Sequence, residues 1–465
     1  MDSSYPEEKV PTYRPINQPP TYSNQASQKI VILPTDIDLT IHQHRSRKLR
    51  AAIVLISAAF WVAYIISISV TEHRSSGVSS SCNGLKSLEN LTASILEWPV
   101  PSDVNIDDCT NMIQDPTTAS NYLRRHFSSS AVFELPLSSE KLFLLSRGAS
   151  AGSVKIVQSD RVGISGRNNA KVHVVARYRH ASVLSQVRLC AISRHGDQRG
   201  IGIFSPQSLA GWKFGIHYDI TVHLPPAVAS SPLQIKHFET DLPLFVHNIG
   251  MLADTAHFDQ LSLKGSMVQI NVGSLSAKNA HIETTNAKIE GTFYTSSALE
   301  LTTTNAPIKV YVGLTNHPNT QATRLAMRTT NAAVTARMSL SSTARMGGQF
   351  KVTGFTTIGP LYLAFVDAPV GSGLLLNAQT SFAPATVDLH STYEGEFRLA
   401  TSSKQAIVSV DNSVMDPAGR GRRRAVELQQ GGQSHAAGSV SWSPQGRRMG
   451  SVYVETSSAA IMLRV

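Results

Sequence analysis

The sequence predicts an all-β protein with one N-terminal transmembrane helix and a disordered cytosolic tail. Three observations support this prediction. Residues 51–70 form an uncharged apolar run that is long enough to span a bilayer. From Ala131 onwards, short strand-like runs alternate with turn residues, and no helical pattern interrupts them. A Thr-Thr-Asn-Ala motif recurs in the last half of the chain and predicts an irregular β-solenoid or β-roll.

Composition narrows the classes of function. The chain has 465 residues and a formal net charge of +10, yet only 16% of its residues are charged. Ser, Thr, Asn and Gln must therefore cover much of its surface, which suits a sugar-rich exterior. Much of the positive charge flanks the apolar run or lies in one late loop, and no nucleic-acid-binding motif accompanies it. We therefore expect no nucleic-acid partner.

Residues 1–50 are rich in Pro, Gln, Ser and Tyr. A segment with so few apolar residues cannot bury enough surface to offset its ordering entropy, so we expect a disordered tail. It contains a PPxY motif formed by Pro19, Pro20 and Tyr22. Paired prolines favour polyproline II, and the tyrosine ring can fill the aromatic groove of a WW domain. By resemblance, such tails recruit WW-domain ubiquitin ligases; the alternative is a chance tetrapeptide in a Pro/Tyr-rich segment.

The apolar run 51–70 is predicted to be a transmembrane helix that acts as an uncleaved signal-anchor. Four fixed positive charges stand directly before it: Arg45, Arg47, Lys48 and Arg50. The positive-inside rule then places the N-terminus in the cytosol, so the chain is a type II single-pass protein of the plasma membrane or a secretory-pathway membrane. A signal peptide and a buried core helix are the alternatives. The long polar lead disfavours the first, and the missing helical periodicity disfavours the second.

Residues 71–130 have little hydrophobic periodicity and are predicted to form a stalk. They contain an N-glycosylation sequon at Asn90. All three cysteines follow the apolar run. In an oxidising compartment Cys82 and Cys109 could close a loop by a disulfide, which would leave Cys190 as a small residue in a strand.

Residues 131–226 are predicted to form an all-β domain. In the run KVHVVARYR, for example, Val172, Val174 and Ala176 share one face, as expected of a half-buried strand. Turn clusters separate this run from similar ones on both sides. Because no helical pattern intervenes, packed sheets are the economical arrangement.

Residues 227–465 are predicted to form a β-solenoid-like domain. Asn286, Asn305 and Asn331 each follow a Thr-Thr pair and precede an alanine, and they are 19 and 26 residues apart. Threonine favours a strand, and asparagine tolerates a left-handed corner and can stack its amide on the next coil. Alanine allows the coils to approach closely. The uneven spacing leaves a plain β-sandwich as the alternative.

A late interruption of this array carries four arginines. The segment 411–439 is polar and Gly-rich and contains Arg420, Arg422, Arg423 and Arg424. The first three fit the R-x-R-R pattern that secretory subtilisin-like proteases cut, and an exposed loop is where cutting can occur. The favoured alternative is a solvated basic loop that could contact an anionic polysaccharide or phospholipid.

The segments HLPP, TTNAxI, YEGEFRLATSS and GSVYVETSSAAIMLRV resemble a known family. They are similar to the putative-adhesin β-solenoid domains found in bacteria and, as single-pass membrane proteins, in fungi. The resemblance covers residues 131–465. It implies a β-solenoid ectodomain, and the family supplies no catalytic residues.

No motif in the sequence predicts catalysis. Its one G-x-S-x-G match, at residues 148–152, falls in a turn cluster between two strand-like runs. The sequence has no H-E-x-x-H, no Cys-His cluster and no Gly-rich phosphate loop, so we expect no enzyme activity, no cofactor and no metal. His281 and Glu283 could share a strand face, but two such residues do not make a metal site.

The favoured function is therefore a non-catalytic extracellular β ectodomain for surface structure, adhesion or binding of a cell-surface glycan or protein. One alternative is a trafficking adaptor or regulated cargo whose PPxY motif recruits a WW-domain ubiquitin ligase. Another is a carbohydrate-active β-helix enzyme, which the scarcity of Asp and Glu in the repeats disfavours.

Overall fold

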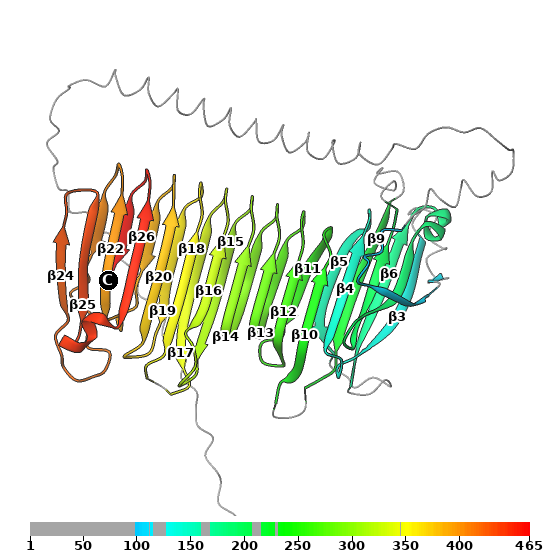
Figure 1. The fold of residues 1–465 in the computed structure, drawn as a ribbon, viewed down its shortest axis with the longest axis horizontal. Helices are drawn as coiled ribbons and strands as arrows, with labels where there is room; N and C mark the ends of the chain where they lie inside the picture. The colour runs from blue at the N-terminus through cyan, green and yellow to red at the C-terminus, as the bar shows by residue number, and fades with distance from the viewer. Residues whose placement is uncertain are drawn as a thin grey trace, which may run out of the picture. The chain divides into compact units, whose positions relative to one another are not determined.

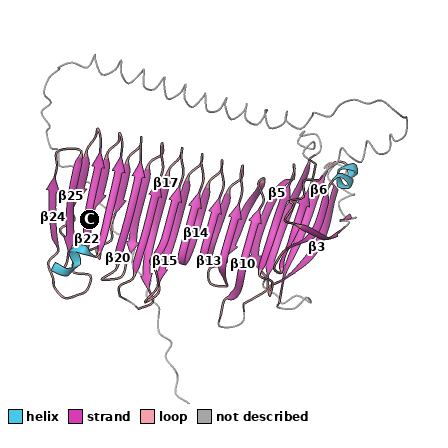
Figure 2. Ribbon diagram, in the orientation of Figure 1, coloured by secondary structure: helices cyan, strands magenta, loops and turns pink. Residues whose placement is uncertain are grey.

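The computed structural model describes residues 98–110, 112–114, 127–159, 168–206, 215–227, 231–344 and 346–465. Several sequence predictions lie outside these ranges: the tail with Pro19, Pro20 and Tyr22, the apolar run 51–70, Cys82 and Asn90. Among the described residues, no helix is long and apolar enough to cross a membrane. The described part consists mainly of β-strands joined by turns and loops, with very few helical residues, which confirms the predicted all-β class (Figure 2).

The strands form two series, which we call layer 1 and layer 2 (Figure 1). Neighbours within each series are hydrogen-bonded. In order along the stack, layer 1 contains β1 (Asn105–Cys109), β7 (Arg188–Arg194), β8 (Gln198–Phe204), β4 (Lys141–Arg147), β10 (Leu233–Asp241), β12 (Ala256–Lys264), β13 (Ile270–Glu283), β14 (Ile289–Thr302), β16 (Thr323–Arg328), β18 (Gln349–Phe355), β20 (Gly373–Thr380), β26 (Gly450–Thr456), β22 (Gly395–Thr401), β25 (His435–Ser441) and β24 (Ala425–Gln430).

Layer 2 shares two long strands with layer 1. The first halves of β13 and β14 pair in layer 2 and their second halves in layer 1, so each strand passes from one layer to the other. In order, layer 2 contains β2 (Ile113–Gln114), β3 (Phe127–Pro136), β6 (Asn169–Tyr178), β9 (Ile216–Leu224), β5 (Ala151–Gln158), β11 (Phe245–Met251), β13, β14, β15 (Ile308–Asn316), β17 (Val334–Ser342), β19 (Leu361–Asp367), β21 (Ala385–Asp388), β27 (Ile461–Arg464) and β23 (Ala406–Ser409). Two short 3-10 helices complete the described elements, at Ala181–Gln186 and Pro444–Arg448.

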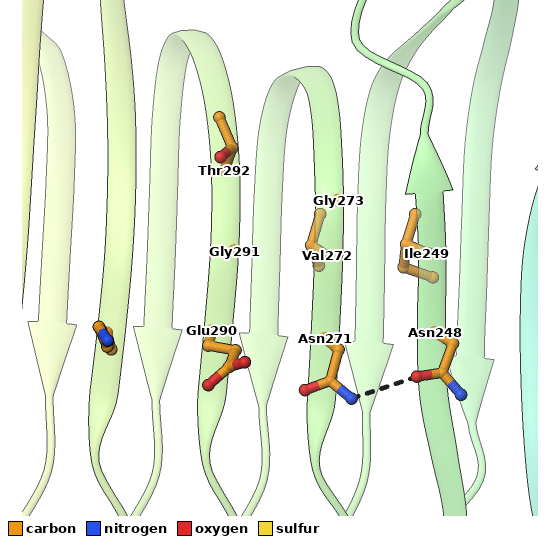
Figure 3. Close-up of a pocket in the computed structure, with 9 residues that line it drawn as sticks. Asn248, Ile249, Asn271, Val272, Gly273, Glu290, Gly291 and Thr292 are labelled. Carbon is orange, nitrogen blue, oxygen red and sulfur yellow. Dashed lines mark hydrogen bonds between the residues drawn. The ribbon is translucent and has the colours of Figure 1, made fainter.

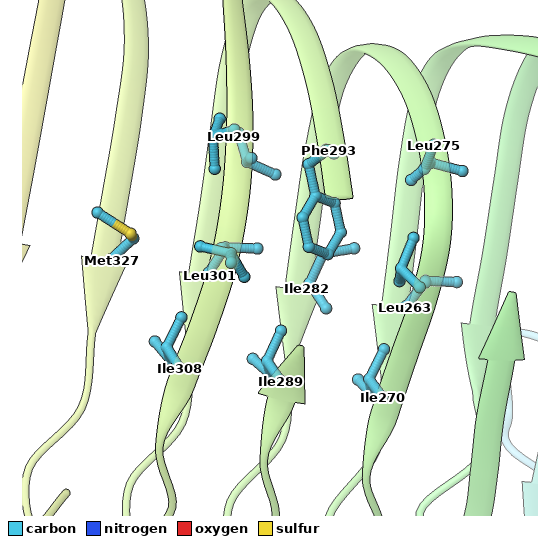
Figure 4. Packing of buried hydrophobic residues seen from close by; sticks show 14 of the residues in the cluster. Leu263, Ile270, Leu275, Ile282, Ile289, Phe293, Leu299, Leu301, Ile308 and Met327 are labelled. Carbon is cyan, nitrogen blue, oxygen red and sulfur yellow. The ribbon is translucent and has the colours of Figure 1, made fainter. Parts of the chain in front are cut away.

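The chain winds in stacked parallel coils through most of this region. Each coil contributes one strand to each layer and pairs with the coils before and after it. Inward-facing side chains of the two layers meet in a continuous apolar core. Figure 4 shows the two rows facing each other, with Ile270 and Ile289 in layer 2 and Leu263 and Ile282 in layer 1. Full burial of each such side chain contributes about 1.5–3 kcal/mol, so the alternation of apolar residues determines the fold.

Each coil turns from layer 1 to layer 2 at a corner that begins with a buried threonine. The Oγ1 of Thr303 donates to the carbonyls of Thr285 (3.3 Å) and Ala287 (3.2 Å) in the preceding coil. Thr329 repeats this contact one coil later, with Thr304 and Ala306. A corner carbonyl that lost its partner would cost about 1–3 kcal/mol, so these hydroxyls hold neighbouring coils in register.

The corner asparagines stack as the sequence predicts, but none of the three has the left-handed φ that was also expected at these corners. Asn305 Nδ2 donates to Asn286 Oδ1, and Asn331 Nδ2 donates to Asn305 Oδ1, each at 2.5 Å. The same corner recurs at Thr356 and Thr380, whose hydroxyls also donate to carbonyls of the neighbouring coil. These two corners could not be predicted from the Thr-Thr-Asn-Ala motif, because an isoleucine and a phenylalanine replace the asparagine there.

Both ends of the stack are closed in the same manner. Antiparallel strands cap it: β1, β7, β3 and β6 at one end, and β24 and β25 at the other. Next to each cap, the coils do not stack in the order in which they occur along the chain. The coil β4/β5 lies between β8/β9 and β10/β11, and the last coil, β26/β27, lies between β20/β21 and β22/β23.

The structure changes three of the expected boundaries. The packing has no break near residue 226, because β10 pairs with β4 and β11 with β5 across it, and one core includes residues from both sides. The expected stalk 71–130 contains β1, β2 and the start of β3. The expected loop 411–439 contains β24 and the start of β25, which form a hairpin.

The expected disulfide between Cys82 and Cys109 is wrong. Cys109 is bonded to Cys190, at a sequence separation of 81 residues. The two cysteines are direct partners in the antiparallel pairing of β1 with β7, which brings their Cα atoms within 4.0 Å. Cys190 does lie in a strand, as predicted, but it forms this disulfide.

Trp98 makes a further contact at the β1 end of the stack, because the Arg188 guanidinium lies 3.8 Å from the centre of its ring.

A buried histidine makes stability depend on pH. His247 in β11 is fully buried, and its Nε2 lies 2.8 Å from Thr240 Oγ1. Burial disfavours the imidazolium and lowers the pKa of His247 from its ordinary 6.5 to about 4. Between these values the unfolded chain binds a proton that the folded chain does not. Folding is therefore opposed progressively as the pH falls from 6.5 towards 4, and the penalty is absent above 6.5.

We expect His247→Gln to weaken this pH dependence. In the wild type, His247 should lower the free energy of unfolding by up to about 1.4 kcal/mol for each unit by which the pH falls through this range. Denaturant titrations at about pH 5 and about pH 7 measure the difference. The same change at His257, which is half-buried against Ser276, is the control. Equal slopes in the wild type and His247→Gln would contradict the assignment.

Candidate functional site

The outer face of layer 2 carries a groove with a volume of about 470 Å³ (Figure 3). It crosses four adjacent parallel strands, β11, β13, β14 and β15. Since strand residues alternate between the two faces of a sheet, the residues next to the buried isoleucines of these strands point outwards into this groove. The position of the groove thus follows from the same alternation that builds the core.

A polar row runs across the strands at one level of the groove. Asn248 pairs with Asn271, Asn271 with Glu290, and Glu290 with Lys309 in successive strand registers. Figure 3 shows the first three of these side chains at the same height on neighbouring strands. Adjacent strands are about 4.8 Å apart, so the row is about 14 Å long.

Glycines form the floor beside this row. Gly291 has a φ of 142°, and a Cβ there would lie 2.0 Å from the carbonyl oxygen of Val272. Gly273 lies against the backbone of Gly250, where a Cβ would come within 3.1 Å. The register between β13 and β14 shifts at this point, so that Gly273 and Ser274 lie opposite Thr292 in a β-bulge. The missing side chains and the bulge together hollow the sheet surface.

The polar groups of the row are only partly paired with each other. Asn271 Nδ2 donates to Asn248 Oδ1 at 3.1 Å, while Asn271 Oδ1 is shielded and has no hydrogen-bond partner among the described residues. The Lys288 ammonium donates to Glu290 Oε2 at 2.7 Å. Lys309 is exposed at the end of the row. A buried acceptor without a partner calls for a donor from water or from a ligand.

An exposed aromatic ring lies beside the groove. Tyr294 follows Thr292 by two residues in β14, and its side chain is 41% exposed. A Cβ placed on Gly313, its partner in β15, would come within 2.5 Å of the Tyr294 ring. The ring therefore lies over this glycine, close to the sheet, and can offer a face to a ligand.

This row was not predicted from the sequence. Its members lie in four different coils, and only the strand pairing brings them together. A local signal does exist: Asn271, Glu290 and Lys309 each directly follow the isoleucine that begins a layer 2 strand. Aligning the repeats at that isoleucine would have placed the three residues in one row.

The four arginines that were predicted to form a basic loop or a processing site differ in their exposure and in their partners. Arg420 and Arg423 are exposed. Arg422 forms an ion pair with Asp416 at 2.8 Å, and its guanidinium lies 5.9 Å from the ring centre of Trp442. Arg424 is half-buried, and burial lowers its pKa while Asp411 opposes that shift.

His281 and Glu283 do share a strand face. The His281 imidazole lies 3.3 Å from carboxylate oxygens of both Glu283 and Glu300. Within the described ranges, no group of three or more His, Cys, Asp and Glu side chains is arranged to hold a metal ion.

No family model matches the chain, and no curated protein matches it. Among solved structures, the chain is similar to a putative cell adhesion protein from Clostridium sporogenes, with 10% sequence identity and a TM-score of 0.18. The match covers 72% of this chain and 99% of the bacterial one.

Proposed function

We propose that this chain is a non-catalytic, adhesion-type binding protein whose layer 2 groove holds a neutral cell-surface glycan in extended form. The observation that carries the proposal is the row Asn248, Asn271, Glu290 and Lys309. Its side chains repeat at the strand spacing, which is close to the length of one hexose. An extended glycan lying across the strands would meet one polar side chain per sugar.

The chemistry of the row fits a neutral ligand. Two of its four members are amides, which both donate and accept hydrogen bonds, as sugar hydroxyls do. The other two carry opposite charges, so the row itself has no net charge. Asn271 Oδ1, which has no partner among the described residues, offers an acceptor to a sugar hydroxyl. Tyr294 adds a ring on which the apolar face of a sugar could stack.

We also propose, from the sequence alone, that the groove faces away from the cytosol. The apolar run 51–70 and the arginines before it favour a type II anchor. The PPxY motif at Pro19, Pro20 and Tyr22 would then lie in the cytosol, where a WW-domain ubiquitin ligase could bind it. This second role concerns trafficking of the protein and is compatible with glycan binding outside the cell.

Asn271→Ala tests the glycan proposal. The full-length chain in mild detergent should bind at least one neutral polysaccharide on an array, and the variant should bind it about three- to tenfold more weakly, as expected for one lost hydrogen bond. Asn377→Ala is the matched control, because Asn377 is an exposed asparagine on β20 in layer 1. Equal binding by the Asn271→Ala variant and the wild type, or no binding to any neutral polysaccharide, would overturn the proposal.

Protease protection tests the orientation. On intact cells that carry a tag at each end of the chain, we expect added protease to remove the C-terminal tag and leave the N-terminal tag. A permeabilised sample, in which both tags are cut, is the control for accessibility. Protection of both tags on intact cells would place the groove inside the cell and contradict the orientation.

A further inference from the structure

The arginine-rich part of the insertion is folded around one carboxylate. Asp416 accepts hydrogen bonds from the backbone N–H groups of Ala418 at 3.0 Å, Arg420 at 2.9 Å and Arg422 at 3.1 Å. It also binds the Arg422 guanidinium, with Nη2 at 2.8 Å and Nε at 3.1 Å. The Asp416 side chain is only 3% exposed. The Arg422 guanidinium holds the pKa of this carboxyl well below its usual range, so the carboxylate stays charged.

In this folded loop, the R-x-R-R segment does not have the extended conformation in which a protease binds its substrate. A protease of this class binds its substrate as an extended strand, by backbone hydrogen bonds. In the structure Gly419 has a φ of 65° and Gly421 a φ of 67°, both in the left-handed region. The backbone N–H groups of Arg420 and Arg422 already donate to Asp416. The hydrogen bonds to the Asp416 carboxylate must break before the R-x-R-R segment can become extended.

The exposures along the segment identify the bond to be cut. Arg423 is exposed, whereas Arg422 before it and Arg424 after it are half-buried, because the chain from here alternates into β24. R-x-R-R specificity and this exposure both select the peptide bond between Arg423 and Arg424. Hydrolysis adds one water across this bond and leaves a carboxylate on Arg423 and an amine on Arg424.

Cutting this bond would not free the C-terminal part. Strand β26 pairs with β20 on one side and with β22 on the other, and β27 pairs with β21 and β23. Val452, Val454, Ile461 and Leu463 of these strands are at most 1% exposed and belong to the main core. The hairpin β24/β25 also pairs with β22. Leaving the stack would break all these pairings and open the core.

We propose that residues 420–424 form a proteolytic processing site that Asp416 holds closed, and that cutting it produces a two-chain protein. The C-terminal piece, residues 424–465, stays in place, with β26/β27 as an interior coil of the stack and β24/β25 as its cap. This inference is independent of the proposed glycan binding, since the groove strands all lie before the cut in the sequence.

The test uses full-length protein in mild detergent and a purified secretory subtilisin-like protease with R-x-R-R specificity. We compare the wild type, Asp416→Ala and the matched control Glu427→Ala, which lies in the same insertion and loses an ion pair with Arg447 outside it. We expect Asp416→Ala to be cut about tenfold faster than the other two, because loss of these charge-assisted hydrogen bonds raises the population of the open loop. Arg423→Ala should not be cut.

Two outcomes would overturn the proposal. Cutting of Asp416→Ala at the wild-type rate would show that Asp416 does not hold the site closed. Separation of the two pieces on size exclusion under native conditions would show that the C-terminal coil is not retained. The expected result is a single native peak that gives two bands on a denaturing gel, with a new N-terminus at Arg424. Asp416→Asn, which keeps the side-chain volume, should also be cut faster than the wild type, so the result does not depend on one variant.

Discussion

The structure depends on a single repeated contact, the hydrogen bond from a buried corner threonine to carbonyls of the neighbouring coil. Thr284, Thr303 and Thr329 each make it to two carbonyls. A coil alone cannot bury its apolar row, so stacking stabilises each coil, and the corner determines how consecutive coils align. Once the corners are in register, inward residues form the core and outward residues form rows. The groove row is one such row, made deep by glycines and a bulge.

The ends of the stack need a different solution, because an open coil exposes unpaired strand edges and part of the core. Here antiparallel strands cover both ends, and a disulfide joins Cys109 in the outermost strand to Cys190. The intercalation of β4/β5 and of β26/β27 means that neither the first nor the last coil in the chain is outermost. The retention of a cut C-terminal piece, which we propose, depends on this order.

Sequence reasoning predicted what is local and missed what is not. The strand class and the corners at Asn286, Asn305 and Asn331 were predictable because alternation and the Thr-Thr-Asn-Ala motif lie within a few residues. The Cys109–Cys190 disulfide was not, because it depends on the pairing of β1 with β7 across 81 residues. The groove row was missed for the same reason, since its members meet only through the register of four strands. The closed arginine loop requires the conformation around Asp416, which a basic motif does not encode.

Position in the stack, rather than position in the chain, determines how each strand is packed. Backbone hydrogen exchange on the full-length protein tests it most directly, because exchange reports the local free energy of opening. We predict that the amides of β26 and β27 exchange as slowly as those of β16 and β17 in the middle of the stack, and more slowly than those of the edge strand β24. Fast exchange of β26 and β27, as in a fraying terminal coil, would contradict the account.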